Sequence, residues 1–114
     1  MTLEEKRKRY VIATQKWRSK KTPEFLKKYD RNINLKKLYG ITLKDYEIIL
    51  QKQGNGCAVC NGPPLGKSSQ FHVDHSHETG KIRGILCHFC NIALGMVRDD
   101  VGHLQKLINY LNKN

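Results

Sequence analysis

The chain has 114 residues, the length of one domain or of one domain with an appendage, and can bury only a modest hydrophobic core. Its mean hydropathy of −0.61 and its lack of a long apolar run exclude a protein built on membrane-spanning helices. Its net charge of +11 is concentrated in residues 1–40, where 13 Lys and Arg stand against 4 Asp and Glu.

A segment this basic favours a polyanionic partner, and nucleic acid is the commonest one. The alternative is a solvated basic helix that only keeps the protein in solution. No signal-peptide pattern follows Met1, so we expect the protein to remain in the cytoplasm. In that reducing compartment, four cysteines indicate metal ligands rather than disulfides.

The basic segment is predicted to be helical. Thr2 and Glu5 form a capping-box pattern, which predicts a first helix to about residue 20. Thr22, followed by a proline, predicts a second helix start, and Gly40 is a plausible stop. Residues 1–40 are therefore interpreted as a basic helical N-terminal extension.

Residues 41–114 are predicted to form a second domain with a short helix, two strands and two further helices. The short helix runs from Thr42 to about Gly54, and the strands lie over 70–75 and 81–86. A helix begins near Cys90, and the last helix, capped by Asp99 or Asp100, carries an apolar stripe of Val101, Leu104, Leu107, Ile108 and Leu111. The predicted fold class is thus α+β and mostly helical, with a C-terminal packing helix.

The four cysteines form two CxxC pairs, Cys57 with Cys60 and Cys87 with Cys90, separated by 26 residues. Two such pairs converging on one ion make a tetrahedral site, which predicts structural zinc. A redox role is disfavoured because no thioredoxin-like pattern surrounds either pair. A four-cysteine site has no open coordination position, so this zinc is expected to clamp the two strands rather than to catalyse.

Between the pairs stands the run Val73-Asp74-His75-Ser76-His77, and Asn91 follows the second pair. Hydrolysis of a phosphodiester needs a base for water and a cation for the phosphate. A neutral imidazole such as His75 suits the base, and the oxygens of Asp74 and Asn91 suit Mg²⁺. Adjacent strand residues point to opposite faces, so the strand must bend here, at about Ser76. The alternative is that Asp74 and His75 cap a turn and that the histidines only support the zinc.

These motifs resemble the recombination endonuclease VII family of His-Me finger nucleases, which are ββα-metal, HNH-like enzymes of phages and bacteria. The resemblance covers about residues 39–112 and none of residues 1–38. It is carried by these runs: Tyr39-Gly40-Ile41-Thr42, Gln53-Gly54, Cys57-Ala58-Val59-Cys60, Val73-Asp74-His75-Ser76-His77, Thr79-Gly80-Lys81-Ile82-Arg83-Gly84-Ile85-Leu86-Cys87 and Cys90-Asn91-Ile92-Ala93-Leu94-Gly95.

The resemblance implies a DNA endonuclease with His75 as general base and one Mg²⁺ or Mn²⁺ held by Asp74 and Asn91. The implied products are a 3′-hydroxyl and a 5′-phosphate. His77 matches the second histidine of the motif, which contacts phosphate or supports the loop. Where some members carry an acid three residues after the Asn, this chain has Leu94, so a second carboxylate ligand lacks support.

Double-stranded DNA is therefore the expected partner, and its form, branched or nicked, stays open. Family members that resolve branched DNA are dimers that extend well beyond the finger, so the sequence does not support a homodimer here. Lys81 and Arg83 lie on the second strand and are predicted to contact phosphate, with a salt-bridged or solvated Arg83 as the alternative. Histidines 72, 88 and 103 are interpreted as structural or surface residues.

The competing functions are a non-catalytic zinc module that binds nucleic acid and a protein-interaction zinc domain.

Overall fold

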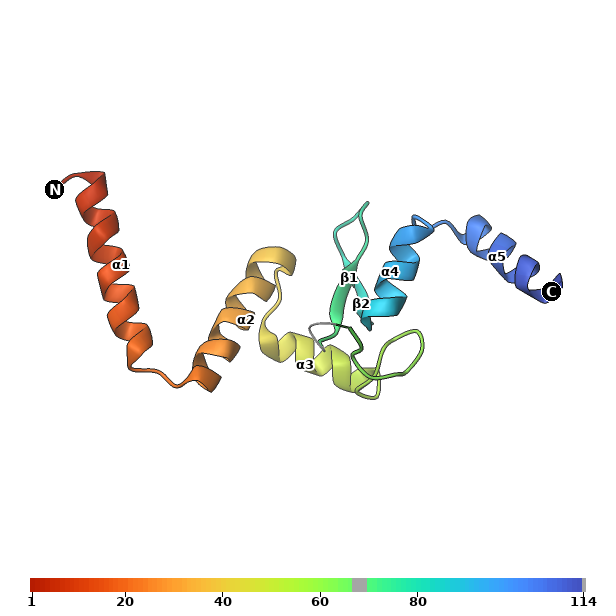
Figure 1. Ribbon diagram of the computed structural model, residues 1–114, viewed down its shortest axis with the longest axis horizontal. Coiled ribbons are helices and arrows are strands. Elements are labelled where there is room, and N and C mark those ends of the chain that lie inside the picture. Colours follow the sequence, from red (N-terminus) through yellow and green to blue (C-terminus); the bar gives the residue numbers. More distant parts are fainter. Residues whose placement is uncertain (67–69, 114) are drawn as a thin grey trace. The chain divides into compact units, whose positions relative to one another are not determined.

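The computed structural model describes residues 1–66 and 70–113 (Figure 1). Its elements run in the order α1 (Leu3–Ser19), α2 (Pro23–Tyr39), α3 (Leu43–Lys52), β1 (His72–His75), β2 (Ile82–Leu86), α4 (His88–Met96) and α5 (Val101–Lys113). The predicted class is confirmed, because helices dominate and one antiparallel pair of strands precedes α4. None of the described helices is long and apolar enough to cross a membrane.

The chain divides into two compact units, Met1–Asp45 and Tyr46–Asn114. In the first unit the predicted caps are present. The Thr2 hydroxyl accepts a hydrogen bond from the Glu5 N–H, and the Glu5 carboxylate accepts one from the Thr2 N–H. Gly40, at φ +71°, ends α2 in the left-handed conformation that glycine adopts without strain. The functional division into 1–40 and 41–114 stays a prediction.

A cluster of aromatic side chains connects α1 to α2. The Trp17 ring lies 4.9 Å from the Tyr29 ring and 6.0 Å from the Phe25 ring, centroid to centroid. Arg18 donates two hydrogen bonds to the Asp30 carboxylate, at 2.9 and 2.8 Å, and these bonds lower the pKa of Asp30. Beyond this connection α1 buries no side chain, so most of its cations face solvent.

The second unit is built around the strand pair and α4, which contacts β1. Its buried side chains centre on Ile85, which is fully enclosed, with Val73, Leu86 and Val97 also buried. A two-stranded ribbon is marginal on its own. Here Gln53, just after α3, extends the hydrogen bonding of β2. Its side-chain amide donates to the Ile85 carbonyl at 2.8 Å and accepts from the Ile85 N–H at 2.9 Å.

The last helix, α5, forms where its apolar stripe predicts it, but most of that stripe lies in solvent. Val101 is 77% exposed and Leu111 73% exposed, and α5 contributes no buried side chain among the described residues. The predicted periodicity is therefore present, whereas a surface that covers the stripe is not found in the described part of the chain.

Candidate active site

The four cysteines meet at one point of the second unit. Their sulfur atoms all lie within 4.8 Å of one another, and the Sγ atoms of Cys60 and Cys87 are 3.8 Å apart. Four sulfurs placed tetrahedrally at about 2.3 Å from a zinc ion would stand about 3.8 Å from each other. The cluster thus has both the donor set and the spacing of a structural zinc site.

Backbone N–H groups donate to three of the four sulfurs of this cluster. Val59 and Gly62 donate to the sulfurs of Cys57 and Cys60, each at 3.4 Å, and Cys90 donates to the sulfur of Cys87 at 3.5 Å. Burial of Cys57 raises the pKa of its thiol, but backbone donors outweigh burial and bring that pKa down to about 6. Deprotonated sulfur is the form that binds metal.

The second cysteine pair joins the strands to α4. Cys87 directly follows β2, and its side chain caps α4, so one residue is both a candidate zinc ligand and the N-cap. The first pair is connected to β2 as well, because the Ala58 N–H donates to the Ile85 carbonyl at 3.0 Å. A zinc ion here would hold the strand pair and the start of α4 together.

The strand pair is irregular between Asp74 and His75. Asp74 pairs with Gly84, but His75 pairs with Ile82, so Arg83 is an extra residue on the opposite strand. Such a bulge twists the ribbon and redirects side chains, and bulges are common beside active sites. β1 ends at His75 and the turn begins at Ser76, where the bend was expected, whereas the extra residue of the bulge lies on β2.

An ion-pair network fixes the Asp74 carboxylate. Arg83 donates to it through Nε at 2.7 Å and through Nη2 at 3.0 Å, and the same Nη2 lies 3.3 Å from both oxygens of Asp99. The hydrogen bonds to Asp74 are the main reason that the pKa of Arg83 is raised. Asp74 is the more enclosed partner, since its side chain is 13% exposed and that of Arg83 is 41% exposed.

A shallow hollow lies beside this network. Asp74 and Arg83 line it together with Leu94 and with the backbone around Gly84, and the first cysteine pair contributes Ala58 and Val59. Leu94, at the position where the resemblance led us to look for an acid, thus faces the same hollow as Asp74. Asn91 lies one turn before Leu94 on α4, on the same side of the helix.

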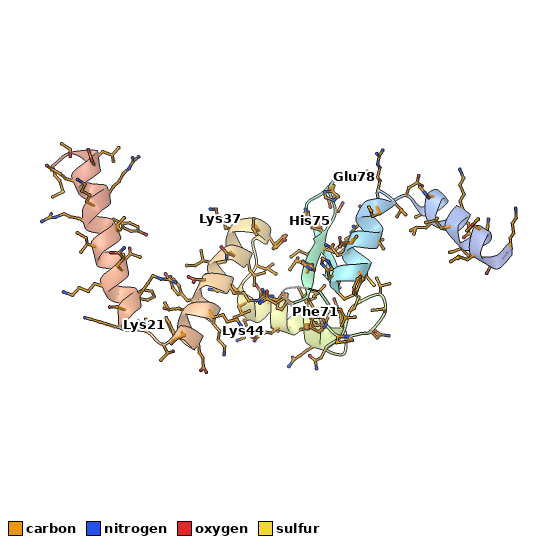
Figure 2. All side chains as sticks on the ribbon, in the orientation of Figure 1. Lys21, Lys37, Lys44, Phe71, His75 and Glu78 are labelled. Atoms are coloured by element: carbon orange, nitrogen blue, oxygen red, sulfur yellow. The ribbon has the colours of Figure 1, made fainter. Side chains whose placement is uncertain are left out.

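The remaining predicted residues lie near the hairpin turn. Figure 2 shows Phe71 at the start of β1, and His75 and Glu78 toward the turn. The rings of His75 and His77 are 5.1 Å apart, centroid to centroid, so the two imidazoles are neighbours. Lys81 is exposed where the chain returns to β2.

The other three histidines lie away from the turn. His72 and His88 form a separate pair, with ring nitrogens 3.4 Å apart, and His103 lies on α5.

Two residues of this region had no assigned role in the sequence analysis. Gln53 was noted only as part of a run shared with relatives, and nothing in its local pattern indicates that it binds Ile85, 32 positions away. Asp99 was considered only as a helix cap. In the structure the cap of α5 is Asp100, which accepts from the Gly102 and His103 N–H groups, and Asp99 turns toward Arg83 instead.

The second unit is thus a strand pair followed by a helix, joined at a cysteine cluster that has the spacing of a zinc site, with Asp74 and His75 beside a bulge. The family model for recombination endonuclease VII matches residues 32–113, which is well over half of the sequence. The chain belongs to the recombination endonuclease VII family, as its motifs predicted.

Two phage proteins are similar to this chain. The Gene 59 protein of Mycobacterium phage D29 is 45% identical over 76 residues, which are 66% of this chain and 46% of that protein. The Gene 59 protein of Mycobacterium phage L5 is 42% identical over 74 residues, 64% of this chain and 44% of that protein. The chain thus spans about half the length of these curated relatives. No solved structure matches it significantly.

Proposed function

We propose that this protein is a metal-dependent DNA endonuclease in which His75 is the general base. The observation that carries the proposal is the bulge opposite Asp74 and His75, where Arg83 is an extra residue on β2, in a finger closed by the cysteine cluster. The family match supports the same class of activity. Because the matched relatives are phage proteins, we further propose that the enzyme acts inside a phage-infected cell.

In this mechanism His75 accepts a proton from a water molecule as the water oxygen attacks phosphorus. The bond from phosphorus to the 3′-oxygen breaks, and that oxygen gains a proton from solvent, which leaves a 3′-hydroxyl and a 5′-phosphate. The four cysteines would hold a zinc ion that stabilises the finger and has no open coordination position for the reaction.

The proposed catalytic cation is Mg²⁺ or Mn²⁺, held by Asp74 and Asn91. These residues fit a hard cation because both supply oxygen. The Asp74 oxygens bind the guanidinium of Arg83, which a cation at Asp74 would have to displace in part. When bound, such an ion offsets negative charge on the phosphate and on the departing oxygen. Lys81 and His77, both exposed near the turn, are proposed to contact DNA phosphate. Arg83 is salt-bridged here, so a phosphate contact from Arg83 requires its release.

The proposal predicts cleavage of DNA by the native protein in the presence of Mg²⁺ or Mn²⁺. We expect strand breaks when the zinc-loaded protein is incubated with supercoiled, linear, nicked and branched DNA, and gel analysis of end-labelled fragments should show 5′-phosphates. The preferred form in this panel identifies the substrate. If every form stays intact with both ions while DNA is still bound, the non-catalytic zinc module replaces the nuclease.

The exposed cations of α1 are proposed to provide sequence-independent affinity for DNA. We expect the triple variant Lys6→Gln, Arg7→Gln and Lys16→Gln to bind DNA more weakly and with less salt dependence, because each lost phosphate contact lowers the salt slope by about 0.9. Glutamine preserves helix propensity, and these side chains lie outside the Arg18–Asp30 pair. Filter binding at several salt concentrations measures the slope.

The matched control removes the same charge from the second unit, as Lys52→Gln, Lys106→Gln and Lys113→Gln. Equal loss of affinity and slope in both triple variants would show that only net charge matters. A larger effect of the α1 variant, with cleavage retained at low salt, locates the DNA contact on α1.

A further inference from the structure

The carboxylate that the proposed function gives to a divalent cation is already bound by an arginine. Arg83 donates to both oxygens of Asp74, at 2.7 and 3.0 Å, with the carboxylate largely buried. A cation that reaches Asp74 must therefore displace at least one of these hydrogen bonds and must approach a fixed positive charge. Both effects lower the affinity of Asp74 for metal.

A second carboxylate, that of Asp99, binds the same guanidinium from another side. Both oxygens of Asp99 lie 3.3 Å from Nη2 of Arg83, the nitrogen that also binds Asp74. If Nη2 leaves Asp74, it keeps a charged acceptor that is already 3.3 Å away. Asp99 thus reduces the free energy needed to uncover Asp74.

The backbone turn that places Asp99 beside Arg83 has an unfavourable conformation. Arg98 and Asp99 both have left-handed conformations, at φ +55° and +56°, which L-residues other than Asn and Asp seldom adopt. The Asp99 N–H closes this turn by donating to the Leu94 carbonyl at 3.0 Å. The turn brings the Asp99 carboxylate to Arg83, which lines the hollow together with Leu94.

We infer that Asp99 is a positioning residue that acts through Arg83: by competing with Asp74 for the guanidinium, it sets the affinity of Asp74 for a divalent cation. This inference rests on the proposed function, because it takes Asp74 as a ligand of that cation. It assigns Asp99 no direct contact with metal or DNA.

The test is Mn²⁺ binding to the zinc-loaded full chain without DNA, measured from the electron paramagnetic resonance signal of free Mn²⁺. We expect Arg83→Gln to tighten binding by roughly three- to tenfold, because a charged competitor becomes neutral. Asp99→Asn should weaken binding by about threefold, because Arg83 then has Asp74 as its sole carboxylate partner in this network. Asparagine tolerates the left-handed conformation, so the turn is retained.

Asp100→Asn is the matched control, because it removes the same charge from the neighbouring residue while asparagine still caps α5. Asp99→Asn should weaken binding more than this control does. In the Arg83→Gln background the difference between the two variants should vanish, since the residue through which Asp99 acts is gone.

The outcomes separate the inference from the proposed function. If Asp99→Asn weakens binding equally with and without Arg83, Asp99 contacts the ion directly and the inference is overturned. If Arg83→Gln and Asp99→Asn leave an Asp74-dependent Mn²⁺ site unchanged, the inference fails and the metal assignment stands. If Asp74→Asn has no effect on Mn²⁺ binding, both fail.

Discussion

Replacing His75 by alanine is expected to reduce DNA cleavage by about 10²- to 10⁴-fold, the usual contribution of a positioned general base. The variant should keep its zinc, its melting profile and its affinity for DNA, because His75 is assigned to none of them. Single-turnover cleavage of labelled DNA, with enzyme in excess, measures the chemical step without the contribution of product release.

The control for this variant is His103→Ala, which removes an imidazole from α5 and should cleave at the native rate. Asp74→Ala and Asn91→Ala should also lose activity, but through the cation. Higher Mg²⁺, or Mn²⁺, should restore part of the rate when one ligand is missing, whereas His75→Ala should not respond. Native cleavage by His75→Ala would refute the assignment of the base.

The second large effect is expected from the cysteine cluster. Cys87→Ser should abolish zinc binding and unfold or aggregate the second unit, because structural zinc contributes on the order of 10 kcal/mol, comparable to the stability of a small domain. Cys57 and Cys87 are themselves among the few buried side chains of this unit, so little other core would compensate. Native protein should contain about one zinc per chain by atomic emission.

Ala58→Ser supplies the matched control for this substitution. It introduces the same hydroxyl group into the exposed part of a cysteine pair without removing a ligand. Its zinc content and thermal melting should remain native. If Cys87→Ser melts like the native protein, or if the purified native protein lacks zinc, the cluster is not a structural zinc site.

The parts of the fold that the sequence predicted depend on local patterns. The capping box at Thr2, the stop at Gly40 and the two CxxC pairs each involve residues within a few positions of one another, and all appear as expected. The first strand was predicted two residues too long at its start, because Gln70 and Phe71 continue its apolar and polar alternation although β1 begins at His72.

The contacts that the sequence did not reveal join distant residues through irregular backbone. The hydrogen bonds between Gln53 and Ile85 span 32 positions, and Arg83 meets Asp99 only because two consecutive residues adopt positive φ. No periodicity encodes such a turn. Likewise, the stripe on α5 correctly predicted a helix, but amphipathic spacing does not specify which surface, if any, covers it.

Cys87 would link the candidate zinc site thermodynamically to the proposed site of the catalytic ion. Its sulfur is a candidate zinc ligand and accepts from the Cys90 N–H, while its carbonyl accepts from the Asn91 N–H at 3.0 Å. A zinc ion bound to Cys87 would order the first turn of α4. The same turn contains the backbone of Asn91, a proposed ligand of the catalytic ion. Since coupling free energies are reciprocal, occupancy of the catalytic position would in turn strengthen retention of zinc.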